Sequence, residues 1–181
     1  MEPLIVPVEL ATPTSIAGVG ELLGRVDGSV PVASRFLGNS VDLRKPVNFQ
    51  SDDTTVLSLA TVHRRNFELK WIERHHKHTQ TFIPLGGRPF VLALAPPTNT
   101  DVPNLADIRA FLFDGSAGFT MRIGTWHEFP FALVDDTDVV VILRRETNQN
   151  LEDVSGNEAS GEDLDKRDLL ARAGRTVRIA L

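Results

Sequence analysis

The sequence predicts a mainly β fold, a sandwich or a barrel, with short helices near its N- and C-terminal ends. Short apolar runs rich in Val, Ile, Leu and Phe recur along the 181 residues. Turn-forming clusters such as Gly86-Gly87 and DGSAG (114–118) separate these runs. Many short strands with turns at near-regular spacing are typical of all-β sandwiches and barrels.

The predicted strands concentrate in a core segment of about residues 55–145. No internal repeat or linker interrupts the chain, so we expect a single domain over residues 1–181. The runs that we interpret as strands are LIVPVEL (4–10), TVLSLATV (55–62), FELKWI (67–72), PFVLALA (89–95), IRAFLF (108–113), FTMRI (119–123), PFALV (130–134), DVVVILR (138–144) and a last strand, TVRIAL (176–181).

Helical signals lie towards both ends. Thr14-Ser15 is a suitable N-cap for a helix that runs to about Leu23, where a glycine follows as the stop. The stretch DLDKRDLLARAG (163–174) has leucines at a spacing that suits a short amphipathic helix. The acidic and polar segment 148–163 has no such pattern, and we expect a mobile loop there.

The composition is that of a soluble domain, and it narrows the classes of partner. The net charge is −5 and the basic residues form no stripe, which argues against nucleic acid or an anionic membrane surface. Because there is no cysteine, a disulfide framework, a thiolate nucleophile and a cysteine metal site are excluded. No apolar run approaches the roughly 18 residues that span a bilayer, and the N-terminus lacks the pattern of a signal peptide. We therefore expect a cytoplasmic protein.

The stretch ERHHKHTQTFIPLGG (73–87) holds three histidines and can be interpreted in two registers. In the first register, His76 and His78 lie two residues apart on a strand, share one face and form a metal-binding pair. No carboxylate follows them at a useful distance. This register is therefore incomplete, and we interpret both side chains as solvated.

The second register begins at Glu73, which shares a strand face with His75. Gln80 follows after four residues and Gly87 after six more. This pattern resembles the first motif of the cupin superfamily, His-x-His, three or four residues, Glu, six residues, Gly. The second cupin motif, Pro-x-Gly-x2-His, resembles RIGTWH (122–127), with arginine in place of proline. The resemblance implies a cupin-type double-stranded β-helix, a jelly-roll-like barrel.

In a small barrel of this kind, inward-facing side chains from several strands converge on one cavity. Glu73, His75, Gln80 and His127 are the residues that this resemblance brings together. Imidazole, carboxylate and amide oxygen suit a divalent first-row metal. We therefore expect these four residues to bind nickel, manganese or zinc, with glutamine as the weakest ligand.

A closer resemblance is to the ureidoglycolate lyase family, and it covers roughly residues 60–144. It implies cleavage of ureidoglycolate to glyoxylate and urea, a step in allantoin and purine-nitrogen breakdown. The chain departs from the family pattern at His76 and His78, where small or apolar residues are expected, and at Glu128, where a second histidine is expected. The matching residues are Glu73-Arg74-His75, Thr79-Gln80, Phe82-Ile83-Pro84, Gly87, Arg109-Ala110-Phe111, Gly118 and Trp126-His127.

This reaction requires a base for the hydroxyl proton, an acid for the departing urea nitrogen and a cationic group for the carboxylate. Either a bound metal lowers the hydroxyl pKa, or His75 or His127 is the base directly, and Glu73 completes the catalytic set. Trp126 is a core residue or a wall of the pocket, and Arg74 points to the opposite strand face. The residues expected to bind the substrate are Gln80, Lys70, Arg122 and Trp126.

Two alternatives keep the fold and change the function. The first is a lyase or hydrolase that acts on another small hydroxy or carbinolamine carboxylate. The second is a cupin that binds a small ligand without catalysis. In each case the partner is a small molecule. Because exposed sheet edges need cover, and because the resemblance implies it, we also expect a homodimer.

Overall fold

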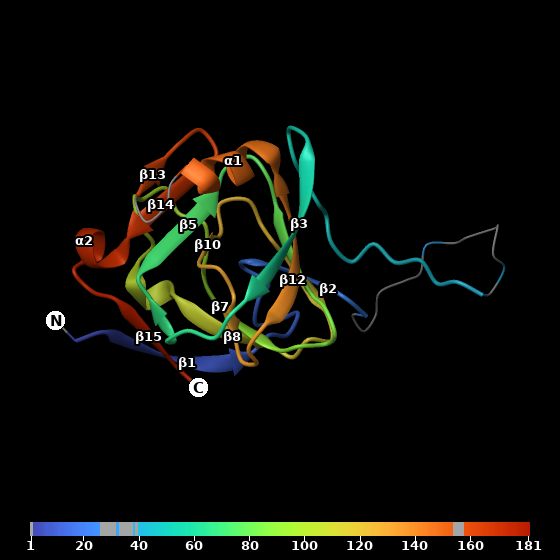
Figure 1. Ribbon diagram of the computed structural model, residues 1–181, viewed down its shortest axis with the longest axis horizontal. Coiled ribbons are helices and arrows are strands. Elements are labelled where there is room, and N and C mark those ends of the chain that lie inside the picture. The colour runs from blue at the N-terminus through green and yellow to red at the C-terminus, as the bar shows by residue number, and fades with distance from the viewer. Residues whose placement is uncertain (1, 26–31, 33–37, 39, 154–157) are drawn as a thin grey trace.

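The computed structural model describes residues 2–25, 32, 38, 40–153 and 158–181, and the side chains of residues 151–153 are not described. The described chain is mainly β, as predicted. Two sheets curl around a shared interior and form a cupin-type barrel (Figure 1). An extended segment that includes residues 40–49 projects from this body (Figure 1).

The larger sheet has ten described strands. In spatial order they are β13 (Ala159–Ser160), β14 (Leu164–Asp168), β5 (Trp71–His75), β10 (Trp126–His127), β7 (Phe90–Ala95), β8 (Arg109–Phe113), β1 (Leu4–Leu10), β15 (Val177–Ala180) and β4 (Glu68–Leu69), with β11 (Phe131–Ala132) paired to β7.

The smaller sheet has five described strands, with β2 and β3 at its edges. The helices are short and lie outside the barrel wall. The strands of this sheet, in order, are β2 (Gly20–Leu23), β9 (Gly118–Met121), β6 (Gln80–Pro84), β12 (Thr137–Arg144) and β3 (Thr55–Val62), and the helices are the 3-10 turn η1 (Leu105–Asp107), α1 (Arg145–Asp153) and α2 (Leu169–Ala173).

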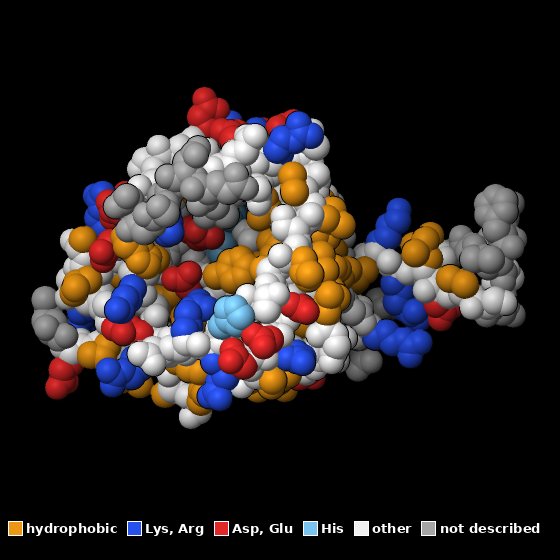
Figure 2. Space-filling model, in the orientation of Figure 1, with side chains coloured by type: hydrophobic (Ala, Val, Ile, Leu, Met, Phe, Trp, Pro, Cys, Tyr) orange, Lys and Arg blue, Asp and Glu red, His pale blue; other side chains and the backbone are white. Residues whose placement is uncertain are grey.

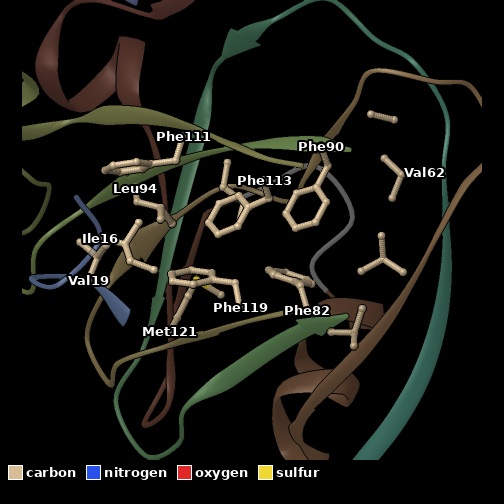
Figure 3. Packing of buried hydrophobic residues seen from close by; sticks show 14 of the residues in the cluster. Ile16, Val19, Val62, Phe82, Phe90, Leu94, Phe111, Phe113, Phe119 and Met121 are labelled. Carbon is tan, nitrogen blue, oxygen red and sulfur yellow. The ribbon is translucent and has the colours of Figure 1, made fainter. Parts of the chain in front are cut away.

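The interior between the two sheets is filled by aromatic rings (Figure 3). Phe90 and Phe113 of the larger sheet stack with ring centroids 5.0 Å apart, and Phe113 lies 4.9 Å from Phe119 of the smaller sheet. Phe82 and Phe119 are fully buried. Burial of each ring contributes about 1.5–3 kcal/mol, so these contacts hold the two sheets face to face.

A second apolar cluster covers the other face of the larger sheet. It includes Ile72, Ala93, Trp126 and Leu169. Strand β7 lies between the two clusters, and all six of its residues are buried. A strand buried on both faces is continuously apolar, which explains the unbroken run PFVLALA.

The strands predicted between residues 55 and 145 are present, with the 3-10 turn η1 among them, and so is the last strand. The predicted helix from Thr14 to Leu23 is wrong, because residues 20–23 form β2 and pair with β9. The capping signal is used in a local turn instead. The amide of Thr12 donates to Ser15 Oγ at 2.9 Å, and the amide of Ser15 donates to Thr12 Oγ1 at 3.0 Å. Cross-strand pairing outweighs this local signal.

The C-terminal predictions are correct in part. The predicted helix over residues 163–174 is a helix only in α2, capped by Asp168 and ended by Gly174 at φ 72°. Its first half is β14, because that segment pairs with β5. The predicted mobile loop over 148–163 begins within α1 and contains β13, while residues 154–157 lie outside the described part. Among the described helices, none is long and apolar enough to cross a membrane.

Candidate active site

Four of the predicted residues face the barrel interior from both sheets. Glu73 and His75 lie two residues apart on β5 and therefore share a face. His127 on β10 is the register partner of Glu73 on one side and of Leu94, an interior residue, on the other. Gln80 on β6 is the register partner of Met121, which also faces the interior.

The side chains of the larger sheet come into contact there. His127 Nε2 lies 3.5 Å from Glu73 Oε1. The ring centroids of His75 and His127 are 5.0 Å apart. One possible ligand atom from each of Glu73, His75 and His127 lies within 4.8 Å of the others. The second register of the histidine-rich stretch is therefore the one that the fold brings together around His127.

This cluster leaves an unusual number of polar atoms without partners. All of its residues are buried, and an unsatisfied buried polar atom costs about 1–3 kcal/mol. A bound cation or a polar ligand would remove that cost. The buried side-chain atoms without a hydrogen-bond partner are His75 Nδ1, His75 Nε2, His78 Nε2, Gln80 Oε1 and His127 Nε2.

The tautomer of His127 follows from its backbone contact. His127 Nδ1 lies 3.1 Å from the carbonyl oxygen of Thr125. A carbonyl oxygen only accepts, so Nδ1 carries a proton and donates it. In the neutral ring, Nε2 is then a lone pair that faces the Glu73 carboxylate. Two acceptors in this arrangement require a proton or a metal cation between them.

The electrostatics of the cluster favour an ionised Glu73 and an uncharged His75. Burial opposes ionisation of Glu73, but the proximity and charge of a protonated His127 outweigh it, so the pKa of Glu73 lies below its usual value. Burial, followed by the charge of His127, lowers the pKa of His75 to about 3. At neutral pH Glu73 is therefore ionised and His75 is uncharged, which is the form of imidazole that binds metals.

These residues fit a divalent metal. The donor set of imidazoles, one carboxylate and one amide oxygen suits a first-row cation. Glu73 supplies the negative charge, and the nitrogens of His75 and the oxygen of Gln80 have no competing partner. The predicted ligands Glu73, His75, Gln80 and His127 all line this interior.

Glu128 follows His127 directly in the chain. Burial, and then the nearby charge of Glu73, raise the pKa of Glu128. Glu128 lines a surface cavity of about 320 Å³ together with Lys70 and Trp71. Trp71 is two residues before Glu73 on β5 and shares its face. The cavity is therefore lined by sequence neighbours of the cluster, and none of the cluster's own residues lines it.

Three predicted residues lie away from the histidines. Trp126 is fully buried in the cluster on the outer face of the larger sheet, and its Nε1 donates to Thr98 Oγ1 at 2.9 Å. The expectation that it lines the pocket is wrong, because Trp126 and His127 are adjacent on a strand and point to opposite faces. Lys70 and Arg122 are surface residues, 3.9 Å from Glu68 and from Glu21 respectively.

The prediction for Arg74 is confirmed. Its side chain points away from the barrel interior and lies over the Trp126 ring, 4.2 Å from the centroid. It also forms a buried ion pair with Asp165 at 2.7 Å. Arg74 is therefore a structural residue that holds β5 to β14.

The solvation prediction is correct for His76 and wrong for His78. His76 keeps 38% of its side chain exposed, whereas the His78 side chain is fully buried. The His78 ring lies 4.6 Å from the His75 ring, and its Nδ1 lies 3.1 Å from Asp163 Oδ2. Asp163 was not predicted as a partner of His78, because it lies 85 residues away in the chain, in the segment predicted as a loop.

Comparison with known proteins agrees with this geometry. A sequence model described as ureidoglycolate lyase matches residues 25–161. The chain is 36% identical over 85 residues to the ureidoglycolate lyase of Azotobacter vinelandii, which covers 47% of this chain and 50% of that protein. It is 31% identical over 106 residues to the enzyme of Pseudomonas paraeruginosa, covering 58% and 62%.

A third relative, the ureidoglycolate lyase of Burkholderia mallei, is 35% identical over 85 residues, covering 47% of this chain and 48% of that protein. The chain spans about half the length of the first of these relatives. The family match covers well over half of this chain and includes Glu73, His75, Gln80 and His127. The chain belongs to the ureidoglycolate lyase family.

Proposed function

We propose that this chain cleaves ureidoglycolate to glyoxylate and urea. The observation that carries the proposal is the buried cluster of Glu73, His75 and His127 inside a barrel of the ureidoglycolate lyase family. Both ring nitrogens of His75 and Nε2 of His127 have no hydrogen-bond partner there. The relatives named ureidoglycolate lyase support the same substrate. The reaction is a step in allantoin and purine-nitrogen breakdown, and a cytoplasmic location stays a prediction.

In the metal-free form of the proposed mechanism, His127 is the base. Its Nδ1 proton is held by Thr125, so Nε2 is free to accept the substrate hydroxyl proton. The electron pair of the broken O–H bond forms the carbonyl of glyoxylate, and the electron pair of the C–N bond leaves with the urea nitrogen. The imidazolium then returns the proton to that nitrogen. The Glu73 carboxylate, 3.5 Å away, stabilises the imidazolium.

His75 and Gln80 have a binding role in the metal-bound form of the site, which is the alternative to a free His127 base. With a pKa of about 3, His75 is too weak a base to take a proton at neutral pH, but its lone pair is available to a cation. In this form we propose that Glu73, His75, Gln80 and His127 would hold a nickel, manganese or zinc ion, with His127 Nε2 as a ligand. When bound, such an ion polarises the substrate's hydroxyl and carboxylate oxygens.

Lys70 is the better placed of the two cations proposed to bind the substrate carboxylate. It lines the cavity of about 320 Å³ that also contains Glu128, the residue directly after His127. Arg122 lies beside Glu21 instead. The alternative is a lyase or hydrolase for another small hydroxy or carbinolamine carboxylate. It is favoured by Glu128, which has a raised pKa, lines this cavity and stands where the family pattern has a histidine.

The experiment is release of glyoxylate and urea from racemic ureidoglycolate, measured without metal and with added nickel, manganese or zinc. Wild-type protein and His76→Ala are expected to be active, while His75→Ala and His127→Ala lose the activity. His76 is the matched control because it is the exposed histidine of the same turn. If folded wild-type protein releases neither product under any condition, the substrate proposal is wrong.

We also propose a homodimer that covers the outer face of the smaller sheet. Leu57 and Leu59 on the edge strand β3 are 70% and 63% exposed, and hydrophobic side chains gather over β3 and β12 (Figure 2). Exposed apolar edges are liable to pair with other chains. The projecting segment carries further exposed apolar side chains, Leu43 and Phe49, which extend the same type of surface.

A further inference from the structure

We propose that His78 is an additional imidazole ligand of the cation centre, and that Asp163 is the residue that orients it. This inference rests on the proposed cation centre but not on the identity of the substrate. His78 belongs to the turn between β5 and β6, directly after the strand that carries Glu73 and His75. It is one of the two histidines that the sequence analysis predicted to be solvated.

Both carboxylate oxygens of Asp163 accept hydrogen bonds from neighbouring groups. Its Oδ1 accepts the backbone amides of His76 at 3.2 Å and Lys77 at 2.8 Å. The hydroxyl of the fully buried Thr147, on α1, donates to its Oδ2. The carboxylate is itself fully buried. Asp163 therefore has little freedom to move, and it also holds the turn that carries His78.

The contact between Asp163 and His78 fixes which nitrogen is free. His78 Nδ1 lies 3.1 Å from Asp163 Oδ2 and 3.4 Å from Oδ1. An ionised carboxylate only accepts, so Nδ1 donates to it. In the neutral ring Nε2 is then a lone pair. That atom is buried and has no hydrogen-bond partner.

This arrangement is the one found around metal-binding histidines. Such a histidine donates its other ring N–H to a carboxylate or a backbone carbonyl, which fixes the ring and makes it a better ligand. His78 has the carboxylate of Asp163 in that role, and His127 has the carbonyl of Thr125. Two histidines on different elements are thus prepared in the same way.

His75 connects the two halves of the site. Its ring lies 4.6 Å from the His78 ring and 5.0 Å from the His127 ring. It also belongs to two separate clusters, one with Glu73 and His127 and one with His78 and Asp163, and within each cluster the possible ligand atoms lie within 4.8 Å of one another. His75 therefore links His127 on one side to His78 on the other, and imidazoles suit a divalent first-row metal.

A structural role alone does not account for the free nitrogen. If His78 served only to hold the turn, its contact with Asp163 would suffice, and burial of an unpartnered Nε2 would cost about 1–3 kcal/mol. Binding of a cation removes this cost. The same argument does not apply to His76, whose Nε2 lies 3.0 Å from Asp165 and whose ring is partly exposed.

The test is calorimetric titration of the full-length protein with Zn²⁺, together with the visible spectrum of the Co²⁺ form. His78→Ala is expected to weaken Zn²⁺ binding by at least about 100-fold and to shift the Co²⁺ spectrum. Asp163→Asn should weaken binding by about 10–100-fold, the range for residues that orient a ligand. The control His76→Ala should bind Zn²⁺ like wild type.

A measurement on the wild-type protein tests the inference even if the variants do not fold. In ¹H–¹⁵N correlation spectra, the His78 Nε2 resonance is expected to move on Zn²⁺ binding while Nδ1 stays protonated. An unmoved Nε2 resonance, or wild-type Zn²⁺ affinity in folded His78→Ala, would overturn the inference.

The outcomes for the ligand and for the substrate are distinguishable. Loss of Zn²⁺ binding in His75→Ala but not in His78→Ala would retain the centre and exclude His78. A wild-type protein that binds no Zn²⁺ would exclude the whole centre. Failure of the substrate proposal would instead appear as intact Zn²⁺ binding without release of urea.

Discussion

Glu73 and His127 are direct register partners on neighbouring antiparallel strands, and their side chains meet 3.5 Å apart inside the barrel. The pairing of β5 with β10 therefore decides the contact, and neither side chain needs a flexible loop to reach the other. Sites on strands are held more rigidly than sites on loops. The proposed proton acceptor and the carboxylate beside it are thus placed by the sheet itself.

Replacing the anion of this pair should remove most of the activity. Glu73→Gln keeps the side-chain volume but removes the charge that stabilises the His127 imidazolium. Since a positioned acid–base group contributes about 10²–10⁴-fold, we expect kcat/KM for ureidoglycolate to fall within that range, mainly through kcat. Steady-state kinetics of urea release measure this effect.

The control for this change is Glu21→Gln, because Glu21 is exposed on β2 and has no part in the cluster. It should leave kcat/KM within about threefold of wild type. Equal activities of Glu73→Gln and Glu21→Gln would show that the carboxylate at 73 is dispensable.

The ion pair between β5 and β14 should control stability at acid pH. Asp165 accepts from Arg74 at 2.7 Å and from Arg167 at 2.9 Å. Burial raises the pKa of Asp165, but hydrogen bonds from Arg74 and His76 outweigh it and hold the pKa below the usual value. A depressed carboxyl pKa stabilises the fold above the unfolded-state pKa, and this contribution is lost as the pH falls through the folded-state pKa.

Asp165→Asn is therefore expected to lower the free energy of unfolding by about 3–5 kcal/mol at pH 7, since it leaves the buried guanidinium of Arg74 without its anion. The difference from wild type should shrink below about pH 4. Urea unfolding at pH 7, 5 and 3.5 measures it. Asp107→Asn, at an exposed position on η1, is the control, and a difference independent of pH would contradict the explanation.

The turn between β8 and β9 should not accept a side chain at Gly115. This residue has φ 87°, and an added Cβ would lie 2.2 Å from the carbonyl oxygen of Gly87. Both the backbone conformation and the contact oppose any other residue. We expect Gly115→Ala to lower the free energy of unfolding by at least about 2 kcal/mol.

Gly18→Ala is the matched control for Gly115→Ala. Gly18 is exposed, and nothing lies within 4 Å of an added Cβ. Its effect should stay within about 1 kcal/mol. Thermal unfolding of the two variants tests the comparison, and equal melting temperatures would mean that the turn relaxes to accommodate alanine.

The proposed dimer should separate when the edge of the smaller sheet becomes charged. Leu59→Glu places a carboxylate on the exposed apolar face of β3, where desolvation in an interface would be costly. Light scattering at micromolar concentration should change from the mass of a dimer to that of a monomer. Leu170→Glu is the control, because Leu170 is 54% exposed on α2, on the opposite side of the body (Figure 1).

If wild-type protein is a monomer at that concentration, the dimer proposal fails. If Leu170→Glu dissociates the protein and Leu59→Glu does not, the interface lies on another face.

Local patterns in the sequence were sufficient for much of the fold. The unbroken apolar run at β7 follows from burial on both faces of that strand. The run VVVIL in β12 is also unbroken, although only alternate residues of it are fully buried. The helix prediction at Thr14 failed because the backbone of residues 20–23 pairs with β9, a partner about 100 residues away in the sequence. Capping signals report on neighbours in sequence and carry no information about such pairing.

The sequence by itself determined that Glu73 and His75 share one strand face, because that depends only on the two-residue period of a strand. The resemblance to the two cupin motifs added Gln80 and His127. Only the tertiary structure decided that His78 is buried, that Asp163 from a distant segment fixes its ring, and that Trp126 faces away from the site. The physical reason is that burial and hydrogen bonding depend on which segments the fold brings together. A contact between residues as distant as 78 and 163 produces no periodic pattern in the sequence from which it could be predicted.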